Sequence, residues 1–324
     1  MNILVTGGAG YIGSHTCKAL AQKGLKPITY DNLVYGHQGA VKWGPLYKGD
    51  LHETEKLTKV LKSEKIEAVL HFAAFAYVGE SIQDPVKYYN NNVLGSMSLL
   101  RAMKNADVKK IIFSSTCATY GIPETAPITE QTPQYPINPY GQSKLMVEQI
   151  LKDMIAPEKL SVTALRYFNA AGADLDLEIG EDHDPETHLI PLAIDAAIKD
   201  DKQLTIFGTD YPTEDGTCVR DYINVTDLAE AHVLALQNLK AQNFEAYNLG
   251  TGQGSSIRQV LKAVEHKTGR PVKAQLGARR PGDPPVLVAS GEKAYQHWGW
   301  RPRHSTLETI VSTAVEWKKK QGTR

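Results

Sequence analysis

Residues 2–13 read NILVTGGAGYIG, a short apolar run that leads into four closely spaced glycines. The apolar run predicts a buried strand, and a helical pattern over residues 12–23 follows it. Gly7, Gly10 and Gly13 fit the spacing G-x-x-G-x-x-G. Glycine permits a tight turn and lets the amides at a helix N-terminus approach a pyrophosphate. The stretch therefore predicts a dinucleotide-binding turn between a strand and a helix.

A carboxylate follows at the end of the second expected strand. Asp31, in the run TYDN (29–32), closes this strand about 20 residues after the glycine turn. A carboxylate at that position accepts hydrogen bonds from the adenosine ribose hydroxyls, and it repels a 2′-phosphate. The sequence therefore favours NAD over NADP, although an aspartate that merely starts a loop is the alternative.

The first half of the chain alternates strand-like and helix-like segments. Alternating βα units predict an α/β fold with a Rossmann-type, doubly wound parallel sheet and right-handed crossovers. We expect strands at 2–6, 25–30, 45–50, 67–74, 109–115 and 160–168, and helices at 12–23, 52–64, 86–104 and after Pro139.

The pattern changes after about residue 170, where glycine, proline and aspartate become frequent. We expect a dinucleotide-binding domain over residues 1–170 and a smaller C-terminal α/β substrate domain over residues 171–324. The segment around 219–250 contains a helical pattern that is expected to pack back onto the first domain.

Composition excludes several classes of protein. The 324 residues contain 36 basic and 36 acidic side chains, so there is no basic footprint for nucleic acid or for a membrane surface. No signal peptide is evident, and no apolar run approaches the roughly 20 residues that span a bilayer. Cys17, Cys117 and Cys218 form no C-x-x-C pattern, which is typical of unpaired thiols in a reducing cytoplasm.

The run NPYGQSK (138–144) carries the expected chemistry. Asn138 is suited to cap a helix and Pro139 to begin it, so Tyr140 and Lys144 lie one turn apart on the same face. A free tyrosine has a pKa near ~10, and a nearby ammonium and a positively charged nicotinamide both favour the phenolate. Tyr140 is therefore a candidate general base. The alternative is a surface pair on an amphipathic helix.

Three features now stand together: the glycine turn, the Tyr140–Lys144 pair and a strand ending in SST (114–116). In these features the chain resembles the extended short-chain dehydrogenases/reductases. More narrowly, it is similar to the UDP-glucose 4-epimerase family, also called UDP-galactose 4-epimerase. The resemblance covers nearly the whole chain, and DYPTEDGTCVRDYI and RRPGD are its most specific parts. The stretches that carry it are FSSTCATYG (113–121), NPYGQSK, LRYFNAAGA (165–173), TIFGTDYPTEDGTCVRDYINVTDLAEAH (205–232), YNLGTG (247–252) and RRPGD (279–283).

The resemblance implies interconversion of UDP-glucose and UDP-galactose with tightly bound NAD. Tyr140 would take the proton of the sugar 4-hydroxyl while hydride leaves carbon 4, and Thr116 would hydrogen-bond that hydroxyl. Lys144 would hold the nicotinamide ribose. The resulting 4-keto sugar would rotate and present its other face to the nicotinamide. Hydride would then return to that face, which inverts carbon 4.

The resemblance also implies two sets of binding residues. The NAD contacts would be Gly7, Gly10, Tyr11, Ile12, Gly13, Asp31, Asn32, Asp50, Leu51, Phe72, Ala73, Ala74, Asn91, Ser114, Tyr140, Lys144 and Phe168. The UDP-sugar contacts would be Thr116, Tyr140, Asn169, Leu189, Phe207, Arg220, Arg280, Asp283 and Leu287. Two positions depart from the pattern, because Ala76 stands where some relatives have a phosphate-contacting lysine and His188 replaces an asparagine.

The preferred sugar stays open. In this family a residue beside the hexose limits the pocket, and Leu287 there is intermediate in size, so N-acetylhexosamines are neither excluded nor assured. The run HFAAFAYVGES (71–81) also resembles the UDP-xylose/UDP-arabinose 4-epimerase branch. A 4,6-dehydratase is disfavoured because Cys117 and Ala118, which follow Thr116, supply no acid–base pair. A catalytically silent NAD-binding regulator is the alternative from a different class.

Two further expectations concern partners and metals. The resemblance implies a homodimer in which the helix after Pro139 takes part, with Met146, Gln149 and Ile150 on its outward face. The run EDHDPETH (181–188) gathers Glu, Asp and His without a recognised ligand spacing. It is expected to be a solvated loop, and no metal site is predicted.

Overall fold

The structure is a computed structural model that describes residues 1–280 and 283–322. The chain divides into two compact units, each built from three segments. The first unit contains Met1–Gly121, Pro133–Tyr167 and Ala229–Tyr247. The second contains Ile122–Thr132, Phe168–Leu228 and the chain from Asn248 onward.

A seven-stranded sheet with the order β11-β6-β5-β4-β1-β2-β3 organises the first unit. The neighbours from β6 to β3 all pair in parallel, which confirms the predicted Rossmann-type doubly wound sheet. Six of its strands lie where the sequence predicts them. The strands are β1 (Asn2–Thr6), β2 (Lys26–Asp31), β3 (Leu46–Lys48), β4 (Ala68–His71), β5 (Lys110–Thr116), β6 (Ser161–Tyr167) and β11 (Phe244–Leu249).

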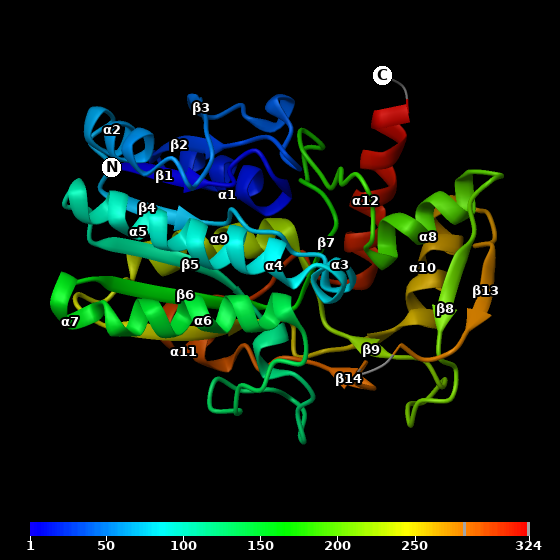
Figure 1. The fold of residues 1–324 in the computed structure, drawn as a ribbon. Helices are drawn as coiled ribbons and strands as arrows, with labels where there is room; N and C mark the ends of the chain where they lie inside the picture. The colour runs from blue at the N-terminus through cyan, green and yellow to red at the C-terminus, as the bar shows by residue number, and fades with distance from the viewer. Residues whose placement is uncertain (281–282, 323–324) are drawn as a thin grey trace. The chain divides into compact units, whose positions relative to one another are not determined.

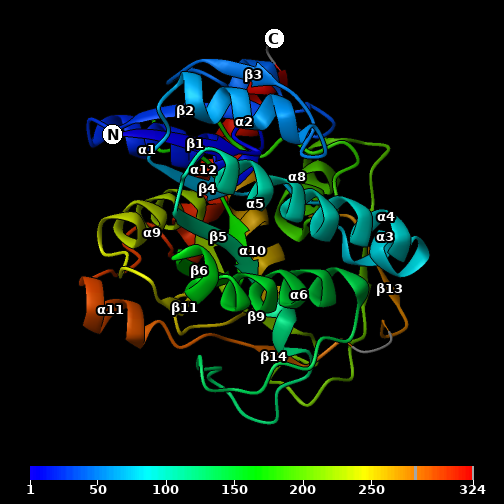
Figure 2. The same cartoon turned by 60° about the vertical axis from the view of Figure 1, so that its left-hand side comes forward.

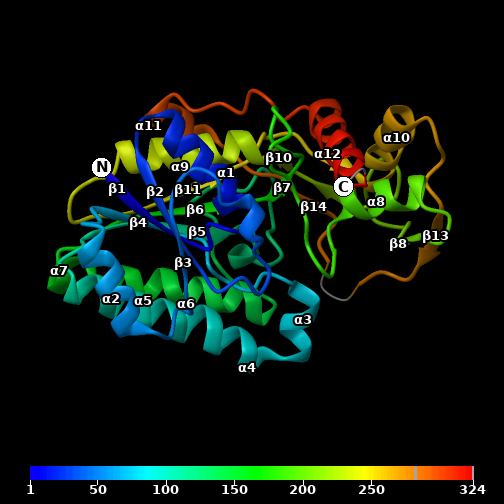
Figure 3. The ribbon, with the colours of Figure 1, turned by 90° about the horizontal axis from the view of Figure 1, so that it is seen from above.

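Helices cover both faces of this sheet, as Figure 3 shows. One face carries α1 (Tyr11–Gln22) and the part of α9 (Val225–Gln237) that follows Leu228, and the other carries α2 (Thr54–Ser63), α5 (Gly95–Asn105) and α6 (Pro139–Asp153). Because helices cover both faces of the sheet, the central strands β4 and β6 are buried along their whole length. In α2 the buried positions are Leu57, Val60 and Leu61, one face of a helix.

The predicted helix over 86–104 is interrupted. It consists of α4 (Pro85–Tyr88), a π-helical turn η2 (Tyr89–Leu94) and α5, and η2 lies beside α6 (Figure 2). The buried Asn92 side chain donates to the carbonyl oxygen of Phe75 and to the hydroxyl of Ser143, 3.0 Å away in each case. The widened turn therefore places an amide where it joins the loop after β4 to α6, a use typical of π-bulges.

The second unit is a smaller α/β assembly. Helices α8 (Leu189–Ile198), α10 (Ile257–Thr268) and α12 (Leu307–Gly322) pack together beside the parallel pair β8 (Leu204–Phe207) and β13 (Ala274–Gly277) (Figure 1). Two small sheets complete it, formed by β7 (Asn169–Ala171) with β10 (Tyr222–Asn224), and by β12 (Ser255–Ser256), β9 (Val219–Arg220) and β14 (Val286–Leu287).

The remaining elements are short. They are η1 (Gln38–Ala40), α3 (Val78–Gln83), η3 (Cys117–Tyr120), α7 (Ile155–Glu158) and α11 (Glu292–Trp298). Among the described residues, every helix is too short or too polar to cross a lipid bilayer.

Candidate active site

The glycine turn joins β1 to α1 in a conformation that only small residues allow. Gly7 has a φ of +74°, and a Cβ there would lie 2.6 Å from the amide nitrogen of Ala73. A Cβ on Gly13 would lie 2.2 Å from the carbonyl oxygen of Gly7. Gly10 is the N-cap of α1 and has no side chain to place over its first turn. The backbone at this helix N-terminus is therefore shaped for close approach by a phosphate.

Asp31 lies at the carboxyl end of β2, next to this turn. Its carboxylate accepts hydrogen bonds from the amide of Ala9 at 3.0 Å and from the amide of Leu33 at 2.8 Å. Burial raises the pKa of Asp31, and these two hydrogen bonds oppose the rise. The carboxylate is thus held beside the glycine turn, where a dinucleotide fold requires it.

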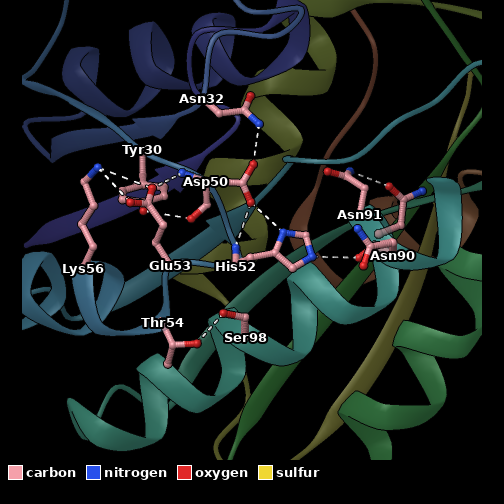
Figure 4. A network of polar contacts seen from close by, with 11 residues as sticks. Tyr30, Asn32, Asp50, His52, Glu53, Thr54, Lys56, Asn90, Asn91 and Ser98 are labelled. Atoms are coloured by element: carbon pink, nitrogen blue, oxygen red, sulfur yellow. Dashed lines mark hydrogen bonds and ion pairs between the residues drawn. The ribbon is translucent and has the colours of Figure 1, made fainter.

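A second carboxylate, Asp50, follows β3 and is the centre of the network in Figure 4. It accepts from the Asn32 amide at 2.9 Å, and from the backbone and ring of His52 at 3.0 and 2.6 Å. The ring of His52 also contacts the carbonyl oxygen of Asn90 at 3.2 Å. Burial raises the pKa of Asp50, but the hydrogen bonds from His52 and Asn32 outweigh it and lower the pKa. Asp50 is therefore an oriented, ionised acceptor.

Most other predicted cofactor residues lie at the same edge of the sheet. The amides of Phe72 and Ala73 donate to the carbonyl oxygen of Thr6, which ties the end of β4 to the end of β1. The Asn91 side chain donates to that of Asn92 at 2.9 Å. Tyr11 and Ile12 begin α1, Leu51 is buried after Asp50, Ala74 follows β4, and Ser114 is in β5, whereas Phe168 belongs to the second unit.

The predicted cap of α6 is confirmed. The Asn138 side chain accepts a hydrogen bond from the amide of Gly141 at 2.8 Å, and Pro139 occupies the first helical turn. The helix then directs Lys144 inward, where its Nζ donates to the carbonyl oxygen of Ser114 at 2.8 Å and lies 5.0 Å from the ring centroid of Phe113. Burial lowers the pKa of Lys144 to about 7.

Tyr140 is partly buried, and its environment opposes ionisation. Burial raises its pKa, the neighbouring Tyr167 raises it further, and a hydrogen bond with Thr116 acts in the opposite direction. Burial is the largest of these effects, so the pKa of Tyr140 lies above its usual value. The expectation that Lys144 and a positively charged nicotinamide together favour the phenolate concerns the NAD complex, and it stays a prediction.

A buried network of hydrogen bonds and an ion pair, one turn along α6 from Lys144, could not be identified from the sequence motifs. Glu148 is fully buried one turn after Lys144 and accepts from the Ser115 hydroxyl at 2.6 Å. Arg166 donates to both carboxylate oxygens of Glu148, at 2.9 and 2.6 Å, and to the Tyr120 hydroxyl at 2.9 Å. The available signal was an acidic residue on the buried face of α6, four positions after the lysine.

Five of the predicted substrate residues of the second unit form two groups. Arg220 and Asp283 make an ion pair of 2.6 Å, and Leu287 is the register partner of Arg220 between β14 and β9. The guanidinium of Arg280 lies 4.2 Å from the ring centroid of Phe207. Two residues of the RRPGD motif, Pro281 and Gly282, lie outside the described residues. Asn169 is in β7, and Leu189 begins α8.

Asp221, next to Arg220, is a structural centre that the sequence did not reveal. The Asn169 side chain donates to its carbonyl oxygen at 2.9 Å. Its buried carboxylate accepts from the amide and hydroxyl of Thr251 at 2.9 and 2.6 Å, and from the amides of Gly252 and Ala289, each at 3.1 Å. The carboxylate of Asp221 therefore connects two other segments of the second unit, residues 251–252 and residue 289, to the chain next to Arg220.

The prediction of a solvated loop at residues 181–188 is wrong at its first residue. Glu181 is buried, and its carboxylate accepts from the ring of His183 at 3.1 Å and from the ring of His188. Sequence spacing could not show this, because the loop folds back on itself before α8 begins.

Comparison with known proteins assigns the family. Residues 3–250 match the NAD dependent epimerase/dehydratase family, and the chain belongs to that family. Within it, the chain is 52% identical over 317 residues to UDP-glucose 4-epimerase of Rhizobium meliloti, which covers 98% of this chain and 96% of the relative. The resemblance inferred from the sequence is thereby confirmed.

Two solved structures show the same fold over almost the whole chain. UDP-glucose 4-epimerase from Brucella ovis, in complex with NAD, is 51% identical with a TM-score of 0.94, and the match covers 97% of each chain. UDP-glucose-4-epimerase from Stenotrophomonas maltophila, with bound NAD and formylated UDP-arabinopyranose, is 39% identical with a TM-score of 0.95 and covers 100% of this chain and 99% of that one.

Proposed function

We propose that this chain is an NAD-dependent 4-epimerase of UDP-sugars that interconverts UDP-glucose and UDP-galactose. The observation that carries the proposal is the arrangement of Tyr140 and Lys144 on α6, with Lys144 bound to the Ser114 carbonyl and Tyr140 to Thr116. The proposal is also supported by two relatives with about 50% sequence identity to this chain, both of which are UDP-glucose 4-epimerases.

The residues of the first unit fit NAD. Gly7 and Gly13 leave room only for backbone, so a pyrophosphate can approach the N-terminus of α1. Asp31 would accept from the adenosine ribose, and Asp50 would accept from the adenine amine. When bound, NAD accepts a hydride from the sugar and returns it. Lys144 would hold the nicotinamide ribose.

Side chains of this protein would carry out the proton transfer of the reaction. Tyr140 would remove the proton from the sugar 4-hydroxyl, and Thr116 would orient that hydroxyl. Because burial raises the pKa of Tyr140, the phenol needs added positive charge to act as a base. Lys144, when protonated, and the oxidised nicotinamide are the two sources of that charge. Glu148 favours the protonated form of Lys144, since it raises the pKa that burial lowers.

The second unit would hold the UDP-sugar. Guanidinium groups bind phosphate oxygens bidentately, so Arg220 and Arg280 are suited to the diphosphate. Arg220 is oriented by Asp283, and Arg280 lies over the ring of Phe207. On this proposal the first unit is the NAD-binding domain and the second is the UDP-sugar domain. A firm grip on the nucleotide and a loose grip on the hexose allow the keto sugar to present either face.

A UDP-pentose activity is the second candidate. It is favoured by the similarity to the Stenotrophomonas maltophila enzyme, whose structure contains formylated UDP-arabinopyranose. A pentose lacks the carbon-6 hydroxymethyl group, so it fits any pocket that admits a hexose. UDP-N-acetylhexosamines would depend on the space beside Leu287.

We also propose a cytoplasmic homodimer. Met146, on the outward side of α6, is 38% exposed, and Gln149 is exposed beside the half-buried Ile150. An apolar side chain on the outside of this helix supports a contact with a second copy. Cys17, Cys117 and Cys218 form no disulfide, which supports a reducing compartment.

The test is to incubate the purified protein with UDP-galactose without adding NAD, and to resolve the products by NMR. UDP-glucose appearing up to a fixed ratio, with no lasting absorbance from reduced nicotinamide, is the expected result. If no product forms even with added NAD, and UDP-xylose and UDP-N-acetylglucosamine are also unchanged, the proposal is overturned.

A further inference from the structure

The loop over residues 181–188 is anchored at both of its ends within the second unit. The indole nitrogen of Trp317, in α12, donates to the carbonyl oxygen of Glu181 at 2.9 Å. Gly180 lies so close to this indole that a Cβ would be 2.5 Å from the ring. At its other end the loop runs directly into α8, which begins at Leu189. The side chains of the loop are therefore carried by an anchored backbone.

Four of these side chains converge on one point. The Nδ1 atom of His183 lies 3.1 Å from a carboxylate oxygen of Glu181 and 3.8 Å from one of Glu186. The Nδ1 atom of His188 lies 3.9 Å from the same oxygen of Glu186, and His188 also hydrogen-bonds Glu181. One ligand atom from each of the four residues lies within 4.8 Å of all the others.

These separations are close to those of a metal centre. Zinc binds imidazole nitrogen and carboxylate oxygen at about 2.0–2.2 Å in a tetrahedron, so its ligand atoms are roughly 3.3 Å apart. Three of the separations, 3.1–3.9 Å, bracket that value, whereas the hydrogen-bonded pair His188–Glu181 is closer and would have to separate on metal binding. The two imidazole rings are 5.2 Å apart and inclined at 76°, so both can direct Nδ1 to one ion without stacking.

Charge and orientation agree with a divalent cation. Once the ion has displaced the imidazole protons, two carboxylates and two neutral imidazoles carry a charge of −2, which one divalent ion neutralises. The ligating oxygen of Glu186 already accepts from the amides of Thr187 and His188, at 2.7 and 2.9 Å, so its position is set before any ion binds. Imidazole together with carboxylate suits zinc, cobalt and nickel better than magnesium or calcium.

We propose that Glu181, His183, Glu186 and His188 form a binding site for one divalent transition-metal ion of the zinc class, with both histidines ligating through Nδ1. The four residues come from one loop, so the ion would close that loop just before α8 and stabilise the position of Leu189. The role is structural, and it is independent of the hydride and proton chemistry of the first unit.

Protons compete with the ion for the same atoms. Burial lowers the pKa of His183, but its hydrogen bonds to Glu181 and Glu186 outweigh burial and raise the pKa to about 10. Metal binding must therefore displace a proton from the cluster, and the bound protons take the place of the ion in its absence. A cluster held together by protons alone is the competing description, and it predicts no metal affinity.

The experiment uses the full chain, stripped with a chelator and dialysed into a non-coordinating buffer. Zinc chloride is titrated by calorimetry, and cobalt chloride by visible absorption, which reports tetrahedral coordination through its intense d–d bands. His183→Gln and Glu186→Gln each remove one ligand and keep the residue polar. His266→Gln removes an exposed histidine of α10 and is the matched control for weak surface binding.

We expect one zinc per chain, with affinity reduced more than about tenfold in His183→Gln and in Glu186→Gln and unchanged in His266→Gln. The tetrahedral cobalt bands should appear in the native chain and in His266→Gln and be lost in the two ligand variants. Circular dichroism of each metal-free variant establishes that it is folded. The proposal is overturned if the folded native chain binds no zinc, or if the ligand variants bind it as tightly as the control.

Discussion

The Nζ atom of Lys144 donates a hydrogen bond of 2.8 Å to the backbone carbonyl oxygen of Ser114. This contact joins α6 to the last part of β5, and it holds the lysine one helical turn below Tyr140. Since Ser114 immediately precedes Ser115 and Thr116, the contact also links the lysine to both the Glu148 network and the residue that hydrogen-bonds Tyr140.

Replacing Tyr140 with phenylalanine should remove the base and leave the fold unchanged. Positioned acid–base groups contribute roughly 10²–10⁴-fold to rate, so kcat for UDP-galactose should fall by at least that factor. Bound NAD, measured after denaturing the purified variant, should match the native amount because the substitution removes only the hydroxyl and leaves the other predicted NAD contacts in place. A variant that keeps its turnover would show that another group takes the proton.

The depressed pKa of Lys144 makes stability depend on pH. The folded chain binds this proton only below about pH 7, whereas the unfolded chain holds it up to about pH 10.5. Because the unfolded state binds more protons in this window, the contribution of Lys144 destabilises the fold at low pH and is relieved as pH rises. The free energy of unfolding of the native chain should therefore rise relative to Lys144→Met between these pH values.

The size of that difference should be on the order of a few kcal/mol across the window. Urea unfolding of both proteins at pH 7, 8.5 and 10, with NAD removed from both, measures it, and other titrating groups cancel in the comparison. A native-to-variant difference that does not change with pH would mean that Lys144 keeps its ordinary pKa in the fold.

Glu148→Gln should destabilise the first unit strongly. The substitution leaves the Arg166 guanidinium buried without its charged partner, and breaking a buried ion pair on one side costs about 3–5 kcal/mol. The double variant Glu148→Gln, Arg166→Met removes the orphaned charge as well, so it should recover part of the loss. Urea unfolding at neutral pH compares the three proteins, and a double variant less stable than the single one would contradict the explanation.

Asp221→Asn should destabilise the second unit. The carboxylate accepts from Thr251, Gly252 and Ala289, and an amide nitrogen in its place would face N–H donors. The loss of charge-assisted, buried hydrogen bonds should cost about 2–3 kcal/mol in the free energy of unfolding. Asp210→Asn is the control, since Asp210 is an exposed ion-pair residue of the same unit. Equal stability of both variants would show that Asp221 is not a structural centre.

Leu287→Tyr tests the sugar pocket and rests on the proposed function. Leu287 is the register partner of Arg220, so a larger side chain there would occupy space next to a proposed diphosphate ligand. We expect kcat/KM for UDP-N-acetylglucosamine to fall about tenfold or more, and that for UDP-glucose to change little. Parallel losses for the two sugars would indicate that Leu287 supports the fold and does not select the sugar.

The strands, the glycine turn and the cap of α6 could be predicted because each depends on residues close together in sequence. The apolar runs specify buried strands, and Gly7 is required by a backbone angle that other residues avoid. The interruption at η2 could not be predicted, because it depends on the Asn92 side chain reaching Phe75 and Ser143. Local helix propensity carries no information about that contact.

The sequence by itself determined the parallel sheet, the dinucleotide turn and the Tyr140–Lys144 pair, since all three follow from short periodic patterns. Only the tertiary structure decided how the charges are balanced. It placed Glu148 against Arg166, gathered two other segments around Asp221, and brought His183 and His188 onto Glu181. The pKa of a side chain depends on burial and on partners distant in sequence, and both exist only after the chain has folded.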